Sequence, residues 1–193
     1  MDNIFEVIMF LVVVGSYAFR FIKGRKDRVA KSTLASFGSV IGATVDRGGE
    51  GISGFIDDIP FSARYRPDDE TGSARVELRY EKELPFIMEI APKGASDLGL
   101  QEPDEGGSFS LGDATLDQAI QVTTEDEKAC REFLRDPIFR GGVELLIREG
   151  CSVRFRRKHA VVSMPGTDWM QEANAAKKLQ QMLQVGHCLI GEF

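Results

Sequence analysis

The side chains of this chain that could do chemistry are two histidines, three cysteines and a few acidic pairs. His187 directly precedes Cys188, but a nucleophilic Cys/His pair or a metal site needs a further orienting ligand, and the spacing supplies none. Cys130 and Cys151 stand on apolar faces of expected elements and read as small core residues. Three cysteines without a CxxC pair argue against a disulfide framework and fit a reducing compartment. We therefore expect a protein that is not an enzyme and holds no metal or other cofactor.

Three glycines, Gly49, Gly51 and Gly54, spell the GxGxxG pattern of dinucleotide-binding loops. That pattern works where a strand precedes it and a helix N-terminus follows to receive the pyrophosphate. Here the following residues, FIDDIPFSARY, have the alternation of a strand. The pattern therefore does not predict a nucleotide site.

Basic side chains crowd one expected hairpin near the C-terminus. Arg154, Arg156, Arg157 and Lys158, with His159 after them, form a candidate partner-binding group. No exposed aromatic residues interleave with them, so they make a poor nucleic-acid platform. The simpler alternative is a solvated hairpin, because most exposed charges contribute little.

An apolar stretch from Ile4 to Ile22 predicts a membrane-spanning helix. Its 19 residues would measure about 28 Å as a helix, close to the thickness of the hydrocarbon core of a bilayer. The chain lacks a basic n-region and a small-residue cleavage site, which argues against a cleaved signal peptide. The residues expected in the bilayer are Val7, Ile8, Phe10, Leu11, Val12, Val13, Val14 and Phe19.

A basic collar follows the apolar stretch. Its residues are Arg20, Lys23, Arg25, Lys26, Arg28 and Lys31, with Asp27 as the single acid among them. Basic residues accumulate on the cytoplasmic side of membrane spans. The collar thus predicts a single-pass protein of the cell inner (plasma) membrane, with its N-terminus outside and its domain in the cytoplasm. We also expect the collar to bind lipid headgroups.

The rest of the chain is acidic. The formal net charge is −6; Asp2 and Glu6 contribute −2 and the collar +5, so the residues from Ser32 onward carry −9. Nucleic acids and anionic lipid surfaces attract basic protein surfaces. We therefore expect no nucleic-acid partner, and lipid contact only through the anchor and the collar.

Alternation of apolar and polar residues predicts strands at 52–56, 61–66, 74–80 and 85–90, a meander of about four around the turn PDDETG. A short strand is expected at 120–122 and a hairpin at 151–164, with Val153, Phe155 and Val161 inward. The wet face of the first hairpin would suit an acidic partner or, more simply, form cross-strand ion pairs. Its residues are Arg64, Arg66, Arg75, Glu77 and Arg79.

Helical spacing recurs from Arg25 to about Ile41, and this apolar face is expected to pack on the domain or, alternatively, on the membrane surface. A second helix is expected after Thr123 or Thr124 as N-cap, and Pro137 should end it. Residues 139–148 suggest a short helix, and Asp168 is expected to cap the last one. The apolar stripe predicted for that last helix is Trp169, Ala173, Ala176, Leu179, Met182 and Leu183.

These patterns predict an α+β fold: one N-terminal transmembrane helix, then a mostly antiparallel sheet with helices on one face. We expect an anchor at 1–23, a basic juxtamembrane collar and amphipathic linker helix at 24–48, and a cytoplasmic α+β domain at 49–193. The connection from Pro92 to Asp113 is either a functional loop or a loosely ordered excursion.

The predicted function is that of a non-catalytic accessory or scaffold subunit. Its anchor would dock the domain onto a larger membrane complex, such as an energy-transducing, secretion or motility assembly, whose other subunits would be its partners. The alternative is a membrane-tethered sensor or small-molecule-binding module, which no residue pattern in the sequence supports.

Overall fold

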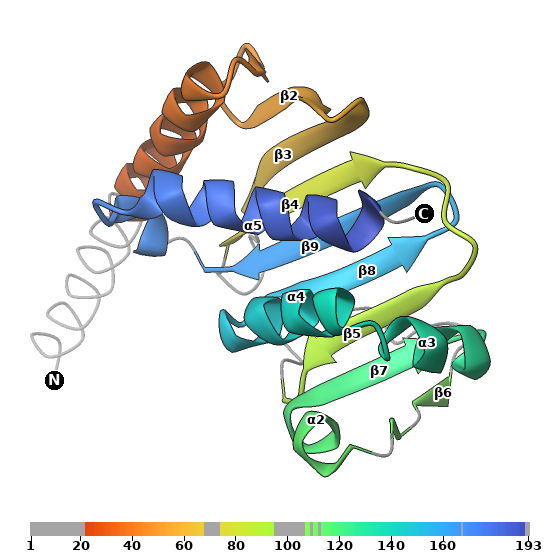
Figure 1. Cartoon of the computed structure of the whole chain (residues 1–193). Helices are drawn as coiled ribbons and strands as arrows, with labels where there is room; N and C mark the ends of the chain where they lie inside the picture. The colour runs from red at the N-terminus through yellow and green to blue at the C-terminus, as the bar shows by residue number, and fades with distance from the viewer. Residues whose placement is uncertain are drawn as a thin grey trace, which may run out of the picture.

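The computed structural model describes residues 22–67, 74–94, 107–108, 110–111, 113–166 and 168–191. These residues form one nine-stranded sheet with helices packed on it (Figure 1). In chain order the strands are β1 (Thr44–Val45), β2 (Gly51–Ile56), β3 (Ile59–Pro67), β4 (Ala74–Glu81), β5 (Met88–Pro92), β6 (Gly107–Ser108), β7 (Ile120–Thr124), β8 (Ser152–Arg156) and β9 (His159–Pro165). Their order in the sheet is β1-β2-β3-β4-β9-β8-β5-β7-β6, and every neighbouring pair is antiparallel. The predicted α+β class with an antiparallel sheet is confirmed.

The helical elements lie on one side of this sheet. The N-terminal helix covers residues 22–40, and α4 and α5 run across the sheet in the same layer (Figure 1). The remaining elements have the bounds α2 (Ala114–Ala119), α3 (Glu127–Phe133), α4 (Pro137–Arg148), η1 (Asp168–Gln171) and α5 (Ala175–Gly191). Because one sheet face is covered, the apolar positions of each strand point to that face, and their alternation is what the sequence displays.

The core lies between the sheet and this helix layer. The strands β3 and β4 contribute Ala63, Val76 and Leu78, none of which exposes 1% of its surface. The helices α4 and α5 contribute residues at helical spacing, such as Leu146 and Leu179. Removing these side chains from water supplies most of the stabilisation of such a fold.

The seat of α5 on the sheet is set by one tyrosine and one glycine. Tyr80 of β4 is fully buried, and its hydroxyl donates a hydrogen bond of 2.8 Å to the carbonyl of Leu183. A Cβ added to Gly186 would lie 2.4 Å from the Tyr80 hydroxyl oxygen and 2.7 Å from its ring. Gly186 is therefore the residue that lets the helix backbone approach the sheet at this crossing.

The N-terminal helix is part of the same core. Ala30, Leu34 and Phe37 are buried, so its apolar face packs on the domain, as the sequence led us to expect. The Tyr65 hydroxyl of β3 donates a 2.5 Å hydrogen bond to Asp27, and the Thr33 hydroxyl donates one of 3.0 Å to the carbonyl of Met170. These contacts fix the helix against both β3 and the turn before α5.

The helix boundaries around α3 and α4 differ from the prediction. Thr123 and Thr124 belong to β7, and the side chain of Asp126 caps α3 instead by accepting from the backbone of Ala129. That helix ends at Phe133 with Leu134 as its C-cap, earlier than the expected end at Pro137. Pro137 instead begins α4, because proline fits the first position, where no backbone N–H is required.

The start of the last helix was also predicted wrongly. Asp168 opens the 3-10 turn η1, and α5 begins only at Ala175. This break shifts the phase of the helix, so Ala173 and Ala176 are exposed whereas Ala175 is buried. Trp169 still enters the core, from the turn rather than from the helix.

The predicted four-strand meander is correct only for its first three strands. The strand expected at 85–90 is β5, shifted to Met88–Pro92, and the hairpin β8–β9 separates it from β4. This long-range insertion leaves no trace in local periodicity. It also places Val161 on the face opposite Val153 and Phe155, because these two pair with Val162 and Ala160, the buried neighbours of Val161 in β9.

No helix within the residues described above is both long and apolar enough to cross a membrane. The predicted span from Ile4 to Ile22 lies outside those residues except for Ile22, which is 55% exposed. Its bilayer residues Val7, Ile8, Phe10, Leu11, Val12, Val13, Val14 and Phe19, and Arg20 of the collar, lie outside them too. The middle of the connection from Pro92 to Asp113, residues 95–106, is likewise not described.

Candidate docking face

The sheet face that points away from α4 and α5, called the open face below, carries most of the polar strand residues. Strand alternation fixes its membership, since each outward residue flanks a buried one. Its charged residues are Arg64, Arg66, Arg75, Glu77, Arg79, Glu81, Glu89, Arg154 and Arg156. Six arginines thus meet three glutamates on one surface of a domain that is acidic as a whole.

The sheet order brings together two arginine groups that are far apart in the sequence. Arg79 of β4 pairs with Val161 of β9, Val161 pairs with Arg154 of β8, and Arg154 pairs with Glu89 of β5. The wet face of the first hairpin and the basic hairpin near the C-terminus are therefore one continuous surface. The sequence could not show this, because the pairing of β4 with β9 is long-range.

Glu89 anchors one half of the open face. Its side chain is 10% exposed and lies 3.1 Å from the Nε of Arg154 and 3.8 Å from a terminal nitrogen of Arg156. A carboxylate this deeply buried needs such partners to offset its desolvation. Sequence analysis missed Glu89, since nothing in PFIMEI distinguishes it from a solvated strand residue.

Glu77 anchors the other half. It accepts from the Nε of Arg75 at 2.9 Å and from the Nε of Arg66 at 3.3 Å. Arg79 forms an ion pair with Glu81. Glu81 is two residues further along the same strand, so the alternation of the sequence could have identified it. Among the residues that the structure describes, Arg64 has no carboxylate within 4.0 Å. The hairpin thus forms one predicted cross-strand pair, Arg66 with Glu77, whereas the pairs of Arg75 with Glu77 and of Arg79 with Glu81 lie within β4.

A groove of about 300 Å³ runs over β3, β4 and β9 on the open face. Its lining residues are Ser62, Arg64, Arg66, Glu77, Arg79, Glu81 and Val161. Phe55 stands beside it: this side chain is 74% exposed and pairs with Pro60, two residues from Ser62 on the same face. The surface therefore combines cationic walls with one exposed aromatic side chain.

His159 lies on the same face opposite Glu81 and Arg156. Partial burial lowers the pKa of His159 below its ordinary value, and the positive charge of Arg79 lowers it further. The lowered pKa favours the neutral form of this histidine. Arg157 and Lys158 lie in the turn beyond it, both exposed, and Arg157 approaches Glu125 to 3.8 Å.

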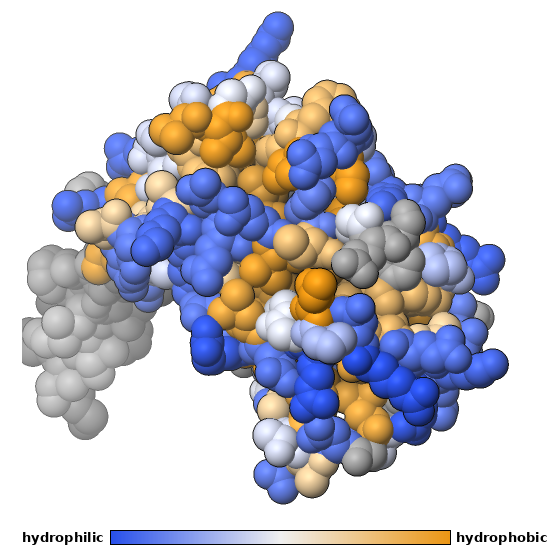
Figure 2. All heavy atoms as spheres, viewed as in Figure 1, coloured by the Kyte–Doolittle hydropathy of each residue, from blue (hydrophilic) through white to orange (hydrophobic). Residues whose placement is uncertain are grey.

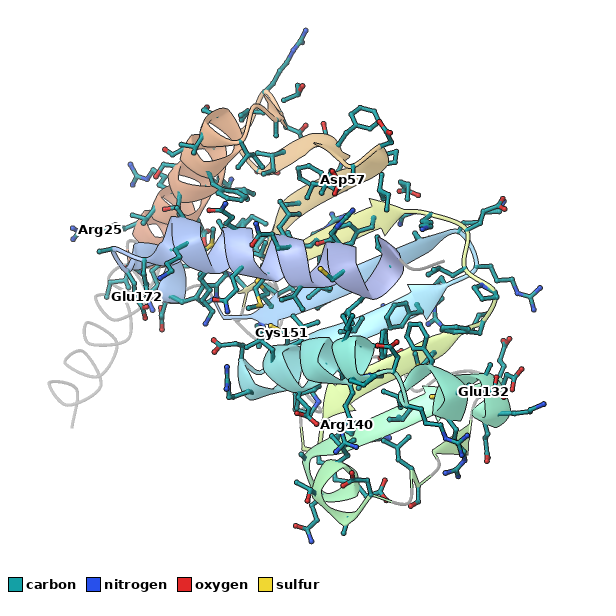
Figure 3. All side chains as sticks on the ribbon, in the orientation of Figure 1. Arg25, Asp57, Glu132, Arg140, Cys151 and Glu172 are labelled. Carbon is teal, nitrogen blue, oxygen red and sulfur yellow. The ribbon has the colours of Figure 1, made fainter. Side chains whose placement is uncertain are left out.

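The collar residues in the described part of the chain lie along the N-terminal helix. Lys26 pairs with Asp168 at 2.8 Å and Lys31 with Glu50 at 2.7 Å, so both hold the helix to the domain. Arg25 and Arg28 are exposed and, with Val29 and Ser32, line a shallow hollow of about 480 Å³. Figure 3 shows Arg25 projecting at the corner beside Glu172, where the turn before α5 lies.

Hydrophobic surface is limited and scattered by comparison. The exposed large hydrophobic side chains of the described residues are Ile22, Val40, Phe55 and Ile138. From the helix side, apolar groups reach the surface at several separate places, including the corner formed by the N-terminal helix and β2 (Figure 2). Charge rather than apolar area therefore distinguishes the open face.

The other residues considered for chemistry do not converge. The described residues contain no group of three or more His, Cys, Asp or Glu that could hold a metal ion. His187 is half-buried with its Nε2 3.7 Å from Asp57, whereas Cys188 is exposed. Cys130 and Cys151 are buried in the core, as predicted, and burial raises the pKa of each thiol to about 12.

The glycine pattern does not form a dinucleotide loop. Gly51 and Gly54 lie within β2, and β3 follows instead of a helix. Asp57 and Asp58 form the tight turn between these strands with φ values of 44° and 67°. These carboxylates therefore belong to a hairpin turn and not to an acid/base pair.

Comparison with known proteins gives a likeness of fold alone. No family model matches the chain, and no curated protein matches it. Among solved structures, the crystal structure of the mycobacterial trehalose monomycolate transport factor A, TtfA, is similar with a TM-score of 0.56. The two chains are 14% identical over 85% of this chain and 94% of that one.

Proposed function

We propose that this protein is a non-catalytic accessory subunit whose N-terminal single-pass anchor holds an α+β docking domain in the cytoplasm beside a larger membrane assembly. The observation that carries the proposal is the way in which the N-terminal helix packs on the domain. The helix that follows the apolar stretch bears the basic collar and also buries Leu34 and Phe37 in the domain. An anchor continuous with this helix would hold the domain at a fixed angle to the membrane.

Two further observations support a docking role. Within the described residues, the open face is a cationic surface that no helix covers, and the histidines, cysteines and acidic residues do not converge on one site. The fold likeness to trehalose monomycolate transport factor A makes a transport assembly the first kind of complex to examine. Secretion, energy-transducing and motility assemblies remain within the proposal.

The native cysteines offer a test of the topology. Cys188 is exposed on α5, whereas the buried Cys130 and Cys151 have raised pKa values and will react slowly with maleimides. We expect a membrane-impermeant maleimide to label the full chain in intact cells through a cysteine introduced at Asn3 (Asn3→Cys) but not through Cys188. Cys188 should become labelled once the membrane is permeabilised, and Cys188→Ser is the matched control. Labelling of Cys188 in intact cells would refute the proposed orientation.

The accessory role itself is tested by isolating the tagged full chain in mild detergent. We expect other membrane proteins to co-purify in constant ratio through a second, size-based step. Recovery as a monomer after chemical cross-linking in the intact membrane would contradict the role, while leaving the topology result untouched.

A further inference from the structure

We propose that the groove over β3, β4 and β9 binds an acidic, extended segment of a partner protein, with Arg64, Arg66 and Arg79 contacting its carboxylates. This inference rests on the proposed docking role and names the chemistry of the partner. It begins from the segregation of charge. The open face has three more arginines than glutamates, whereas the residues from Ser32 onward carry −9 in total.

Among the described residues, the internal ion pairs do not saturate Arg64, Arg66 and Arg79. Each guanidinium has five N–H donors in a fixed planar arrangement and accepts none. Glu77 serves two arginines, and Arg64 has no carboxylate partner among the described residues. Arg64, Arg66 and Arg79 all line the groove, where a second carboxylate would form charge-assisted hydrogen bonds with them.

The spacing of the arginines fits an extended chain. Arg64 and Arg66 are two residues apart on β3, so their Cα atoms are about 6.4–6.8 Å apart. An extended peptide repeats same-side side chains at that same interval, whereas a helix does not. Acidic residues at alternate positions of such a segment would therefore meet successive arginines. Phe55 would supply an apolar contact at one end of the groove, as aromatic residues do at many interfaces.

A protein segment fits the surface better than a lipid bilayer or a small molecule. The N-terminal helix lies in the layer of α5 with its axis alongside the sheet, so an anchor extending it would not point the open face at the membrane (Figure 1). Small-molecule sites are typically about 300–1,000 Å³ and mostly apolar. This groove is at the lower end of that range and has charged walls, with Val161 as its single apolar lining residue.

Fluorescence anisotropy of the full chain in neutral detergent tests the proposal directly. The probe is a labelled peptide of alternating glutamate and threonine, with an alternating lysine and threonine peptide as its negative counterpart. We expect the acidic peptide to bind, and the double substitution Arg64→Gln with Arg66→Gln to weaken it by about tenfold or more, since each lost charge-assisted contact matters. The matched control is Arg135→Gln with Arg148→Gln, two exposed arginines outside the open face. It should leave affinity unchanged.

Each other outcome overturns the inference. Equal loss in both double variants would mean that general charge, and not the groove, binds the peptide. Inorganic phosphate and free glutamate are tested as competitors. If both displace the peptide at the same concentration, and the protein binds the peptide no more tightly than it binds either anion, the groove is a small-anion site. Binding of phosphatidylserine vesicles that requires Arg64 and Arg66 would indicate a lipid surface. Thermal melting of each variant shows that it is folded. Because no step of this experiment uses the membrane, failure of the peptide to bind is distinct from failure of the topology test.

Discussion

Replacing Gly186 with alanine tests whether α5 is seated on the sheet as the structure shows. The new Cβ would lie 2.4 Å from the Tyr80 hydroxyl oxygen and 2.7 Å from two ring carbons. Tyr80 exposes none of its surface, so its ring cannot turn towards solvent to make room without displacing its neighbours in the core. The substitution therefore has two effects of opposite sign on stability, a gain in helix propensity and a loss of favourable packing.

The magnitudes decide the sign. Exchanging glycine for alanine inside a helix gains about 1 kcal/mol. Overpacking a core costs about 1–3 kcal/mol, and displacing the Tyr80 hydroxyl from the Leu183 carbonyl costs about 1 kcal/mol more. We expect Gly186→Ala to lower the free energy of unfolding by about 1–3 kcal/mol. For a chain of this size that corresponds to a fall in Tm of about 2–12 °C.

The assay is urea unfolding of the full chain in detergent, followed by the fluorescence of Trp169, the single tryptophan, which is buried beside α5. Gly141→Ala is the matched control, because a Cβ at Gly141 of α4 meets nothing within 4 Å. That control should be stabilised by up to about 1 kcal/mol. In a Tyr80→Phe background, which lacks the closest contact atom, Gly186→Ala should cost less. Stabilisation of the Gly186 variant, equal to that of the control, would refute the close approach of α5 to β4.

Three further substitutions probe the seat of the N-terminal helix and two titrating groups. Leu34→Ala should cost about 2–5 kcal/mol by calorimetry and expose the collar to trypsin, whereas the exposed Ser36→Ala should do neither. A hydrogen bond of 2.8 Å from Lys178 lowers the pKa of Glu149 in the folded protein. The Lys178–Glu149 pair therefore stabilises the fold fully above the pKa that Glu149 has in the unfolded chain, and this stabilisation is lost as the pH falls through its lower pKa in the folded state. Glu149→Gln should then be less stable than wild type at pH 7 and equal to it in acid. The pKa of His159 is lowered by burial and Arg79, so wild type should lose stability relative to His159→Gln in melts taken from about pH 7.5 to about pH 5.5.

Local pattern was sufficient for part of this structure. The alternation in β3 and β4 predicted their buried and wet faces correctly, because one covered sheet face imposes a period of two. The buried face of the N-terminal helix followed in the same way from its apolar spacing. Both inferences depend only on neighbours within one element.

What the sequence left open depends on distant pairings. Nothing local indicates that β9 lies beside β4, and this pairing is what unites Arg79 with Arg154 across Val161. The boundary errors at Thr124 and Asp168 have a related cause. Both residues are good N-caps in isolation, but Thr124 is held in β7 by its pairing with β5, and Asp168 starts a 3-10 turn that packs Trp169 into the core.

The placement of charge gives the proposed arrangement a physical logic. Near the anionic inner leaflet, a basic collar is attracted by about 1 kcal/mol per residue, whereas an acidic domain is repelled. Such a molecule would hold its domain off the lipid, at distances where screening over about 8 Å has removed most of the attraction to headgroups. The arginines of the open face would then be free to meet carboxylates on a neighbouring protein. The acidic charge elsewhere on the domain would repel an acidic partner that approached any other side. The segregation of charge would therefore determine the orientation of the partner more than its affinity.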